Sequence, residues 1–209
     1  MIRLHQVEKR YDGKSVLKIP ELQIEKGIYW VSGINGSGKT TFLKILAGIT
    51  PFNGDAFLND ISIKKQPADY RRLVSFAEAE PLYPSFITGS DLVSFYQDIR
   101  KAPDQQVKKL VAFSGLGQNL ETQIGAYSSG MVKRLSLLLA FIGQVPLILL
   151  DEPLATLDTE AVHSLPDLIN EYKQEYGTSF IFSSHQPFLS ETLVNRELVI
   201  TGQTIHFSK

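Results

Sequence analysis

A glycine-rich loop between an apolar run and an amphipathic segment limits what this chain can fold into. The loop, residues 33–40, reads Gly-Ile-Asn-Gly-Ser-Gly-Lys-Thr. The apolar run 28–31 precedes it, and apolar residues recur at helical spacing over 42–49 after it. A strand, a tight loop and a helix in this order place the loop at a helix N-terminus, which favours anions. The sequence therefore predicts a phosphate-binding unit.

The residue types within the loop favour a nucleoside triphosphate. Glycines let the backbone curl so that its N–H groups point inward. Lys39 can reach the β- and γ-phosphates, and the Thr40 hydroxyl is the group that this motif uses on Mg²⁺. We predict ATP and Mg²⁺ as ligands, the former bound by Gly33, Asn35, Gly36, Ser37, Gly38, Lys39, Thr40 and Thr41. The alternative is a Gly/Ser turn that contains Lys-Thr by chance, and the flanking strand and helix argue against it.

A pair of carboxylates follows a second apolar run. Four apolar residues, 147–150, end in Asp151 and Glu152. In enzymes with a phosphate-binding loop, an aspartate at such a strand end holds Mg²⁺, directly or through water. Glu152 would point differently and polarise the attacking water. The alternative is a strand end capped by ordinary surface acids, which the loop in the same chain disfavours.

The order of strand-like and helical segments predicts an α/β fold. Strands are expected near the N-terminus and again in the last third, where helix 159–176 separates the apolar runs 145–150 and 179–183. The middle is helical: Thr88 can cap a helix with one apolar stripe, and a second helix follows Pro103. The remaining strands are expected at 2–4, 22–24, 28–31, 56–58, 61–63, 197–201 and 204–207.

This pattern indicates one domain over 1–209 with a P-loop NTPase core, a mostly parallel sheet flanked by helices. We expect an N-terminal antiparallel β subdomain and the ATP-binding core to be formed by 1–82 and 142–209, and an inserted helical subdomain by 83–141.

Composition adds exclusions. A net charge of -1 gives no basic surplus, so no nucleic-acid partner is expected. Cysteine is absent, which excludes disulfides and thiolate metal sites. The apolar stretch 135–150 is interrupted by Gly143 and Pro146, so it is too short for a bilayer span of about 20 residues. We expect a cytoplasmic chain.

Taken together, the motifs resemble the nucleotide-binding domain of ATP-binding cassette (ABC) transporters over nearly the whole length. Residues 128–131, Ser-Ser-Gly-Met after Tyr127, resemble the signature motif. Asp158, after Leu157, resembles the D-loop aspartate, and His185 resembles the switch histidine. Tyr11 lies where the family stacks an aromatic ring on adenine.

The resemblance implies a head-to-tail homodimer when ATP is bound. Ser128 and Gly130 of each copy would close the other copy's ATP, and Asp158 of the D-loop would also belong to the nucleotide-binding residues. Lys39 and His185 would stabilise charge on the γ-phosphate, while Glu152 orients the water. Transmembrane permease subunits would be the partners, so the chain would lie peripherally on the inner face of the membrane.

Two departures from the family pattern bear on mechanism. Glu78 stands where the Q-loop has glutamine, and we expect it to keep a role linked to the metal. Ser129 and Met131 replace a glycine and the terminal glutamine of the signature. This form resembles that of compact exporters, so export is expected.

Apolar residues in the loop after Pro81 are candidates for the partner-facing surface: Leu82, Tyr83 and Phe86. An equally good interpretation is that they pack the helical lobe. Two other functions stay open at this point, a soluble ABC ATPase acting on ribosomes or nucleic acid, and a nucleotide-gated clamp with little turnover.

Overall fold

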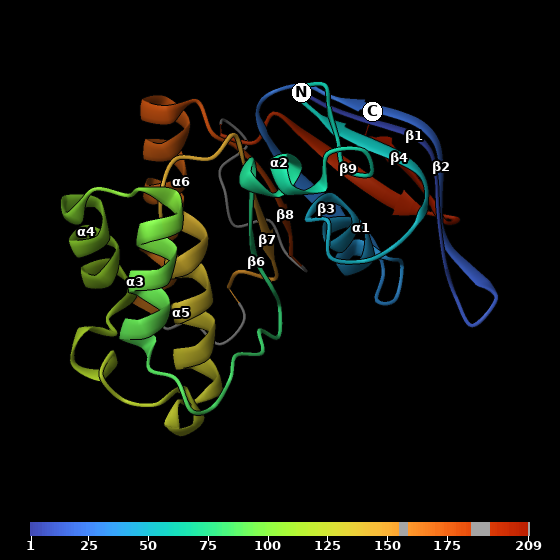
Figure 1. Cartoon of the computed structure of the whole chain (residues 1–209). Helices are drawn as coiled ribbons and strands as arrows, with labels where there is room; N and C mark the ends of the chain where they lie inside the picture. The colour runs from blue at the N-terminus through green and yellow to red at the C-terminus, as the bar shows by residue number, and fades with distance from the viewer. Residues whose placement is uncertain (155–158, 185–192, 209) are drawn as a thin grey trace.

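The computed structural model describes residues 1–154, 159–184 and 193–208 (Figure 1). Its first sheet has four antiparallel strands in the order β2-β1-β4-β5. Ile2 pairs with Ile24 and Leu4 with Leu22, so the apolar positions of neighbouring strands share one face. The strands are β1 (Ile2–Tyr11), β2 (Lys14–Ile24), β4 (Asn53–Leu58) and β5 (Ile61–Ser62).

The second sheet is mixed, with six strands in the order β10-β9-β3-β8-β7-β6. All neighbours in it are parallel except β9 and β10. The strands are β3 (Ile28–Ser32), β6 (Val74–Ala77), β7 (Leu147–Asp151), β8 (Ser179–Ser183), β9 (Arg196–Thr201) and β10 (Thr204–Phe207). Every residue of β7 is buried, as expected for a parallel strand covered on both faces.

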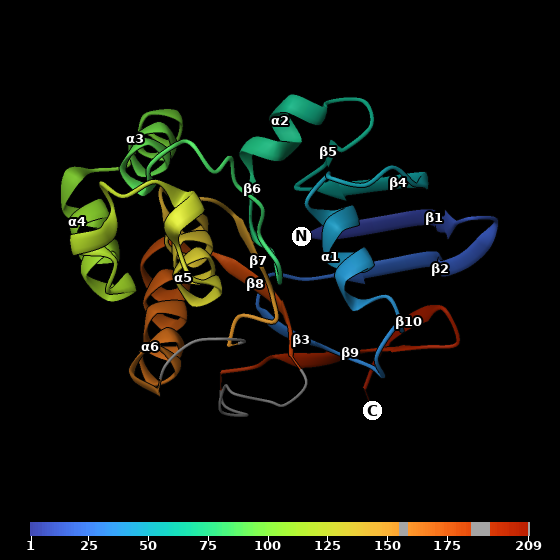
Figure 2. The ribbon, with the colours of Figure 1, turned by 90° about the horizontal axis from the view of Figure 1, so that it is seen from below.

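Helix α1 (Lys39–Leu46) lies between the two sheets (Figure 2). Its apolar side chains are fully buried. They form one core with the first sheet and with two alternate residues of β7, Leu147 and Leu149. Ile148 and Leu150 of the same strand face a second core, formed with the helices on the far side. The period of two along a strand therefore divides the core into two layers.

The helices of the second core are α3 (Gly89–Arg100), α4 (Asp104–Ser114), α5 (Ser129–Phe141) and α6 (Thr159–Tyr176). Short 3₁₀ turns at Gly117–Asn119 and Ile124–Ala126 link α4 to α5. Thr88 caps α3 as expected: its hydroxyl accepts from the Asp91 N–H, and the Asp91 carboxylate accepts from the Thr88 N–H.

The predicted α/β class, with an antiparallel sheet, a mostly parallel sheet and helices, is confirmed. Two short elements were not predicted, α2 (Pro67–Arg72) and strand β6. The predicted apolar stripe of α3 is only partly buried, because Phe95 and Ile99 are exposed.

Candidate functional site

The glycine-rich loop connects the end of β3 to the start of α1. Gly36 and Gly38 have φ values of 76° and 108°, in the left-handed region that favours glycine. A Cβ on Gly33 would lie 2.5 Å from the Ser37 Oγ, so any other side chain there would force the loop open. The loop therefore needs glycines to close.

Lys39 begins α1 and turns back over the loop. Its side chain is buried, and its Nζ donates to the carbonyl oxygens of Gly33 at 2.9 Å and Ile34 at 3.4 Å. The ammonium group is thus held at the N-terminus of a helix, where backbone N–H groups and the helix dipole also attract anions. Such an arrangement can bind phosphate.

A cavity of about 500 Å³ lies over the loop, within the usual range for small-molecule sites. It brings together residues from β1, β2, the loop, α1 and the position after β7. Most of the loop residues predicted to bind nucleotide line it, together with Tyr11 and Glu152. The full lining is Tyr11, Val16, Asn35, Gly36, Gly38, Lys39, Thr40, Thr41 and Glu152.

Tyr11 is half-exposed at the cavity edge, as a ring that stacks on a base must be. The Lys9 Nζ lies 4.4 Å from the centroid of the Tyr11 ring and donates to the Pro51 carbonyl oxygen at 2.9 Å. This cation–π contact supports one face of the ring.

Asp151 fits a cation. Its side chain is 1% exposed, and its Oδ1 accepts a hydrogen bond from the Ser183 Oγ at 2.5 Å. Its Oδ2 is buried and has no hydrogen-bond partner among the described residues. An unpartnered buried carboxylate oxygen is costly, and carboxylate and hydroxyl oxygens are the ligands that Mg²⁺ prefers. The donor set of Asp151 and Thr40 therefore suits this metal.

Glu152 has an unusual backbone. Its φ of 46° lies in the left-handed region, which is uncommon for residues other than glycine and is frequent at functional sites. The Glu152 N–H donates to both the carbonyl oxygen and the Oγ of Ser183, at 3.2 and 3.0 Å. This conformation separates the direction of the Glu152 side chain from that of Asp151.

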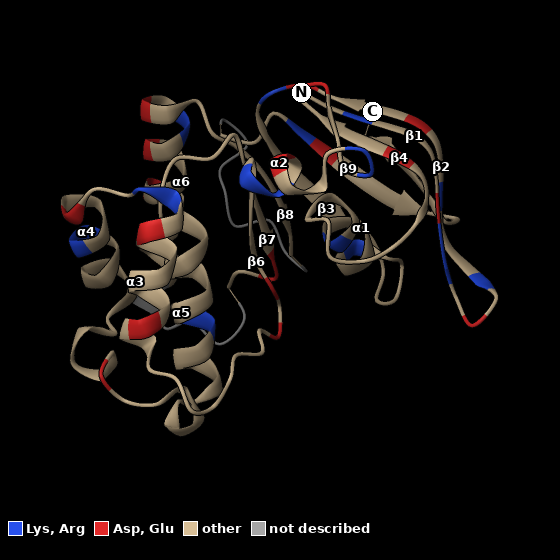
Figure 3. Cartoon of the chain, viewed as in Figure 1, with Lys and Arg blue, Asp and Glu red and all other residues tan. Residues whose placement is uncertain are grey.

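Glu78 follows β6, which is adjacent to β7, so the acidic groups gather where these strands end (Figure 3). The Glu78 carboxylate lies 3.3 Å from the Lys44 Nζ of α1, and both side chains are about one third exposed. Lys44 thus offsets the charge that a glutamate adds in place of a glutamine.

Lys133 of α5 was not predicted as a site residue. Its side chain is 2% exposed, and its Nζ donates to the carbonyl oxygens of Glu78 at 2.6 Å and Asp151 at 2.7 Å. Burial lowers the pKa of Lys133 to about 8, while Asp151, Glu152 and Glu78 act in the opposite direction. One sign of this burial is present in the sequence, because Lys133 lies in a helix and the residues that follow, 135–142, are all apolar except Ser136.

Ser128 is the N-cap of α5, and its Oγ accepts from the Met131 N–H at 3.2 Å. A hydroxyl that accepts in this way still has its own proton to donate. Neither Ser128 nor Gly130 lines the cavity over the glycine-rich loop. Within one chain, the glycine-rich loop and Glu152, the residue after Asp151, thus share a cavity that does not include the signature-like segment. Asp158 and His185 lie outside the described residues.

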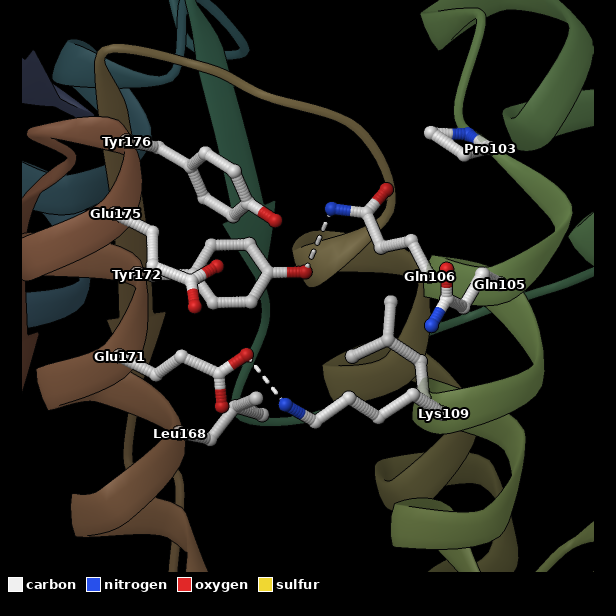
Figure 4. Close-up of a pocket in the computed structure, with 10 residues that line it drawn as sticks. Pro103, Gln105, Gln106, Lys109, Leu168, Glu171, Tyr172, Glu175 and Tyr176 are labelled. Carbon is white, nitrogen blue, oxygen red and sulfur yellow. Dashed lines mark hydrogen bonds and ion pairs between the residues drawn. The ribbon is translucent and has the colours of Figure 1, made fainter.

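A second cavity, of about 310 Å³, lies between α4 and α6 and contains none of the predicted site residues (Figure 4). Its polar groups join the two helices. Lys109 pairs with Glu171, and the Gln106 Nε2 donates to the Tyr172 hydroxyl at 2.9 Å. Gln106 also bonds both backbone groups of Gly143, which precedes β7. The polar contacts around this cavity therefore link α4 to α6.

Gln106→Ala is expected to lower the free energy of unfolding by about 1–3 kcal/mol, because the Gly143 N–H and C=O both lose their partner. Urea denaturation measures the change. The control is Gln105→Ala, an exposed neighbour that lines the same cavity. An equal loss of unfolding free energy in both variants would contradict a stabilising role for the bonds between Gln106 and the Gly143 backbone.

The candidate partner-facing residues differ in exposure. Leu82 and Phe86 are 94% and 73% exposed, whereas Tyr83 is half-buried against the second core. Phe95 and Ile99 of α3 add further exposed apolar area. Packing of the helical lobe therefore does not account for Leu82 and Phe86. Within the described parts of the chain, no helix has both the length and the hydropathy for a bilayer crossing.

Comparison with known proteins places this site in a family. A family model described as ABC transporter matches residues 17–155. The ABC transporter ATP-binding protein YtrB of Bacillus subtilis is 34% identical over 94% of this chain and 67% of that protein. The spermidine/putrescine import ATP-binding protein PotA of Fusobacterium nucleatum is 30% identical over 88% of this chain. The chain spans about half the length of that relative.

The fold also matches a solved structure, an ATP-binding cassette described as a dimer in a post-hydrolysis state bound to ADP and Pi. The TM-score is 0.85 with 18% identity, over 100% of this chain and 98% of that chain. At this identity, the likeness concerns the fold.

Proposed function

Because the chain belongs to the ABC transporter family, as an ATP-binding domain, we propose that it binds and hydrolyses ATP to drive transport by separate membrane subunits. The observation that carries the proposal is the cavity in which Lys39, the glycine-rich loop and Glu152 meet. Elements far apart in the sequence there supply a phosphate cradle and a carboxylate for water.

The binding step follows from the loop. Inward N–H groups and the Lys39 ammonium take the β- and γ-phosphates, and Tyr11 stacks on the base at the cavity edge. Asp151 and Thr40 would hold Mg²⁺, which supplies charge neutralisation between the phosphates when bound. Asp151 is suited to this because one of its oxygens has no partner among the described residues.

The chemical step is attack of water on the γ-phosphorus, in which a new P–O bond forms as the bond to the β–γ bridging oxygen breaks and ADP leaves. Glu152 accepts a hydrogen bond from that water and orients it in line with the bond that breaks. Lys39 stabilises charge on the γ-phosphate oxygens. His185 is proposed as the switch histidine and Asp158 as the D-loop aspartate. Both roles rest on the family resemblance alone.

We propose that the site is completed by a second copy of the chain, arranged head to tail. The Ser128 hydroxyl proton and the Gly130 N–H stand at the N-terminus of α5, an anion-binding end. Since neither residue lines the cavity of its own chain, the second copy would bring them to the γ-phosphate.

We propose that a transmembrane permease subunit docks on the exposed apolar residues Leu82, Phe86, Phe95 and Ile99. Docking there would hold the chain peripherally on the inner face of the membrane.

We propose export as the direction of transport, because of the form of the signature segment. One relative is named as an import protein, so importers contain related ATP-binding proteins as well. ATP-dependent substrate loading of inside-out vesicles tests the direction.

The direct test of the proposal has two parts. The purified chain is assayed for Mg²⁺-dependent release of phosphate from ATP, and a tagged chain is isolated from membranes to identify copurifying integral membrane proteins. We expect turnover, and a change in its rate when the partner is added. A chain that neither hydrolyses ATP nor recovers a membrane protein would refute the proposal, and ATP-dependent association with ribosomes would replace it.

Glu78→Gln tests the metal-linked role of Glu78. The variant loses the ion pair with Lys44 and one negative charge near Asp151. We expect the Mg²⁺ concentration for half-maximal ATPase activity to rise by about tenfold, because one carboxylate charge is removed from the site. The control is Glu80→Gln, an exposed residue of the same loop. Unchanged rate and Mg²⁺ dependence in Glu78→Gln would show that the role is absent.

A further inference from the structure

Ser183, the last residue of β8, is fully buried although it is polar. It pairs with Asp151 in the parallel register between β8 and β7. Since side chains alternate along a strand, Ser183 lies on the face of Ile181 and Asp151 on the face of Leu149, and both of these apolar residues belong to the core around α1. Ser183 and Asp151 therefore meet side by side on the face of the sheet that α1 covers.

The Ser183 hydroxyl uses its donor and its acceptor on two different residues. It donates to the Asp151 Oδ1 at 2.5 Å and accepts from the Glu152 N–H at 3.0 Å. The Ser183 carbonyl oxygen accepts from the same N–H at 3.2 Å. One residue thus bonds the side chain of Asp151 and the backbone of Glu152.

Each bond fixes a feature on which the proposed reaction depends. With Oδ1 bonded, the Asp151 carboxylate has a defined rotation, which leaves Oδ2 without a partner among the described residues. The bonds to the Glu152 N–H hold that residue in its left-handed conformation, with φ of 46°. In this conformation the Glu152 side chain lines the cavity over the glycine-rich loop.

We propose that Ser183 is a positioning residue, which sets Asp151 for the metal and Glu152 for the water through one hydroxyl group. The proposal rests on the proposed function of the site. It predicts that loss of the hydroxyl weakens the contribution of Mg²⁺ to nucleotide binding, and that it slows turnover, without weakening nucleotide binding in the absence of Mg²⁺.

The experiment compares Ser183→Ala with Ser75→Ala. Ser75 is a buried serine of β6, and its Oγ has no hydrogen-bond partner among the described residues, so its loss removes the same atoms without breaking a bond. Affinity for a fluorescent ATP analogue is measured with Mg²⁺ and with EDTA, and kcat and KM are measured for ATP.

For Ser183→Ala we expect the Mg²⁺-dependent gain in affinity and kcat each to fall by about 10- to 100-fold, as for other partners of metal-ligating side chains. Affinity in EDTA should stay within about twofold of wild type. Ser75→Ala should resemble wild type in all measurements. A merely structural role for Ser183 would instead lower thermal stability and both affinities together, and that result would overturn the proposal.

Two further variants decide the question if Ser183→Ala does not fold. Ser183→Thr keeps the hydroxyl group. Ser183→Val has the shape of the threonine variant but lacks the hydroxyl. We expect the threonine variant to retain the Mg²⁺-dependent gain and the valine variant to lose it; equal gains would overturn the proposal. Because binding is measured apart from turnover, a wild-type chain without ATPase activity would refute the proposed function and still leave the role of Ser183 decided by affinity.

Discussion

Glu152→Gln is expected to lower kcat for ATP hydrolysis by about a hundredfold or more, while ATP still binds. Glutamine keeps the size of the side chain and removes the carboxylate that accepts from the attacking water. The loop, Lys39 and Asp151 are untouched, so the affinity for Mg²⁺-ATP should stay near that of wild type. Steady-state phosphate release and equilibrium binding measure the two effects.

The variant should also accumulate an ATP-bound dimer, visible by size-exclusion chromatography, because the dimer forms and does not hydrolyse its ATP. The control is Glu21→Gln, the same change at an exposed position of β2. If wild type hydrolysed ATP rapidly and Glu152→Gln matched that rate, Glu152 would have no part in the mechanism. If wild type hydrolysed ATP as slowly as is expected of Glu152→Gln, even under dimerising conditions, the chain would be a nucleotide-gated clamp.

Mixing two inactive variants is expected to restore activity. Gly130→Asp places a carboxylate in the first turn of α5, which suits the helix dipole but repels a γ-phosphate. Alone, this variant should be as inactive as Glu152→Gln. In a mixed head-to-tail dimer, one site combines an intact Glu152 with an intact Gly130 from the other copy. Random association makes half the dimers mixed, so about a quarter of wild-type activity should return if the sites act independently.

The matched control mixes Glu152→Gln with the double variant that carries both changes. No site in that mixture has an intact Glu152, so no activity should return. If the first mixture were as inactive as the control, that result would contradict the proposal that each site is closed by the other copy and acts independently of the second site. The variants are mixed in the absence of nucleotide, Mg²⁺-ATP is then added, and the release of phosphate is measured.

Helix α6 could be predicted because its apolar pattern is long, whereas β1 (Ile2–Tyr11) and β2 (Lys14–Ile24) extend well beyond the predicted ranges 2–4 and 22–24. Helix α6 occupies the predicted range 159–176, and β8 the predicted range 179–183. The two elements that were missed have four and six residues, too few to show a period. They are held by tertiary contacts instead: β6 by its pairing with β7, and α2 by a hydrogen bond from the Tyr70 hydroxyl to the Leu46 carbonyl oxygen.

The candidate site could be predicted only where local chemistry reveals it. The glycine-rich loop and the Asp151-Glu152 pair are local motifs, and the structure brings Lys39 and Glu152 to one cavity. Ser183 and Lys133 were missed for a physical reason. Their partners are an adjacent strand end and two backbone carbonyls. Such contacts depend on strand register and helix placement, which no local pattern of residues expresses.

The buried ammonium of Lys133 has a consequence for how two nucleotides would influence one another. In the proposed dimer, α5 offers Ser128 to the ATP of the other copy, and about one and a half turns later Lys133 grips the strand ends beside its own ATP. The first turns of α5 would thus contact both nucleotide sites, Ser128 at one and Lys133 beside the other. A shift of Asp151 on hydrolysis would therefore move Lys133 and, through the start of α5, the Ser128 that contacts the other nucleotide, so the two sites would be coupled over a few residues.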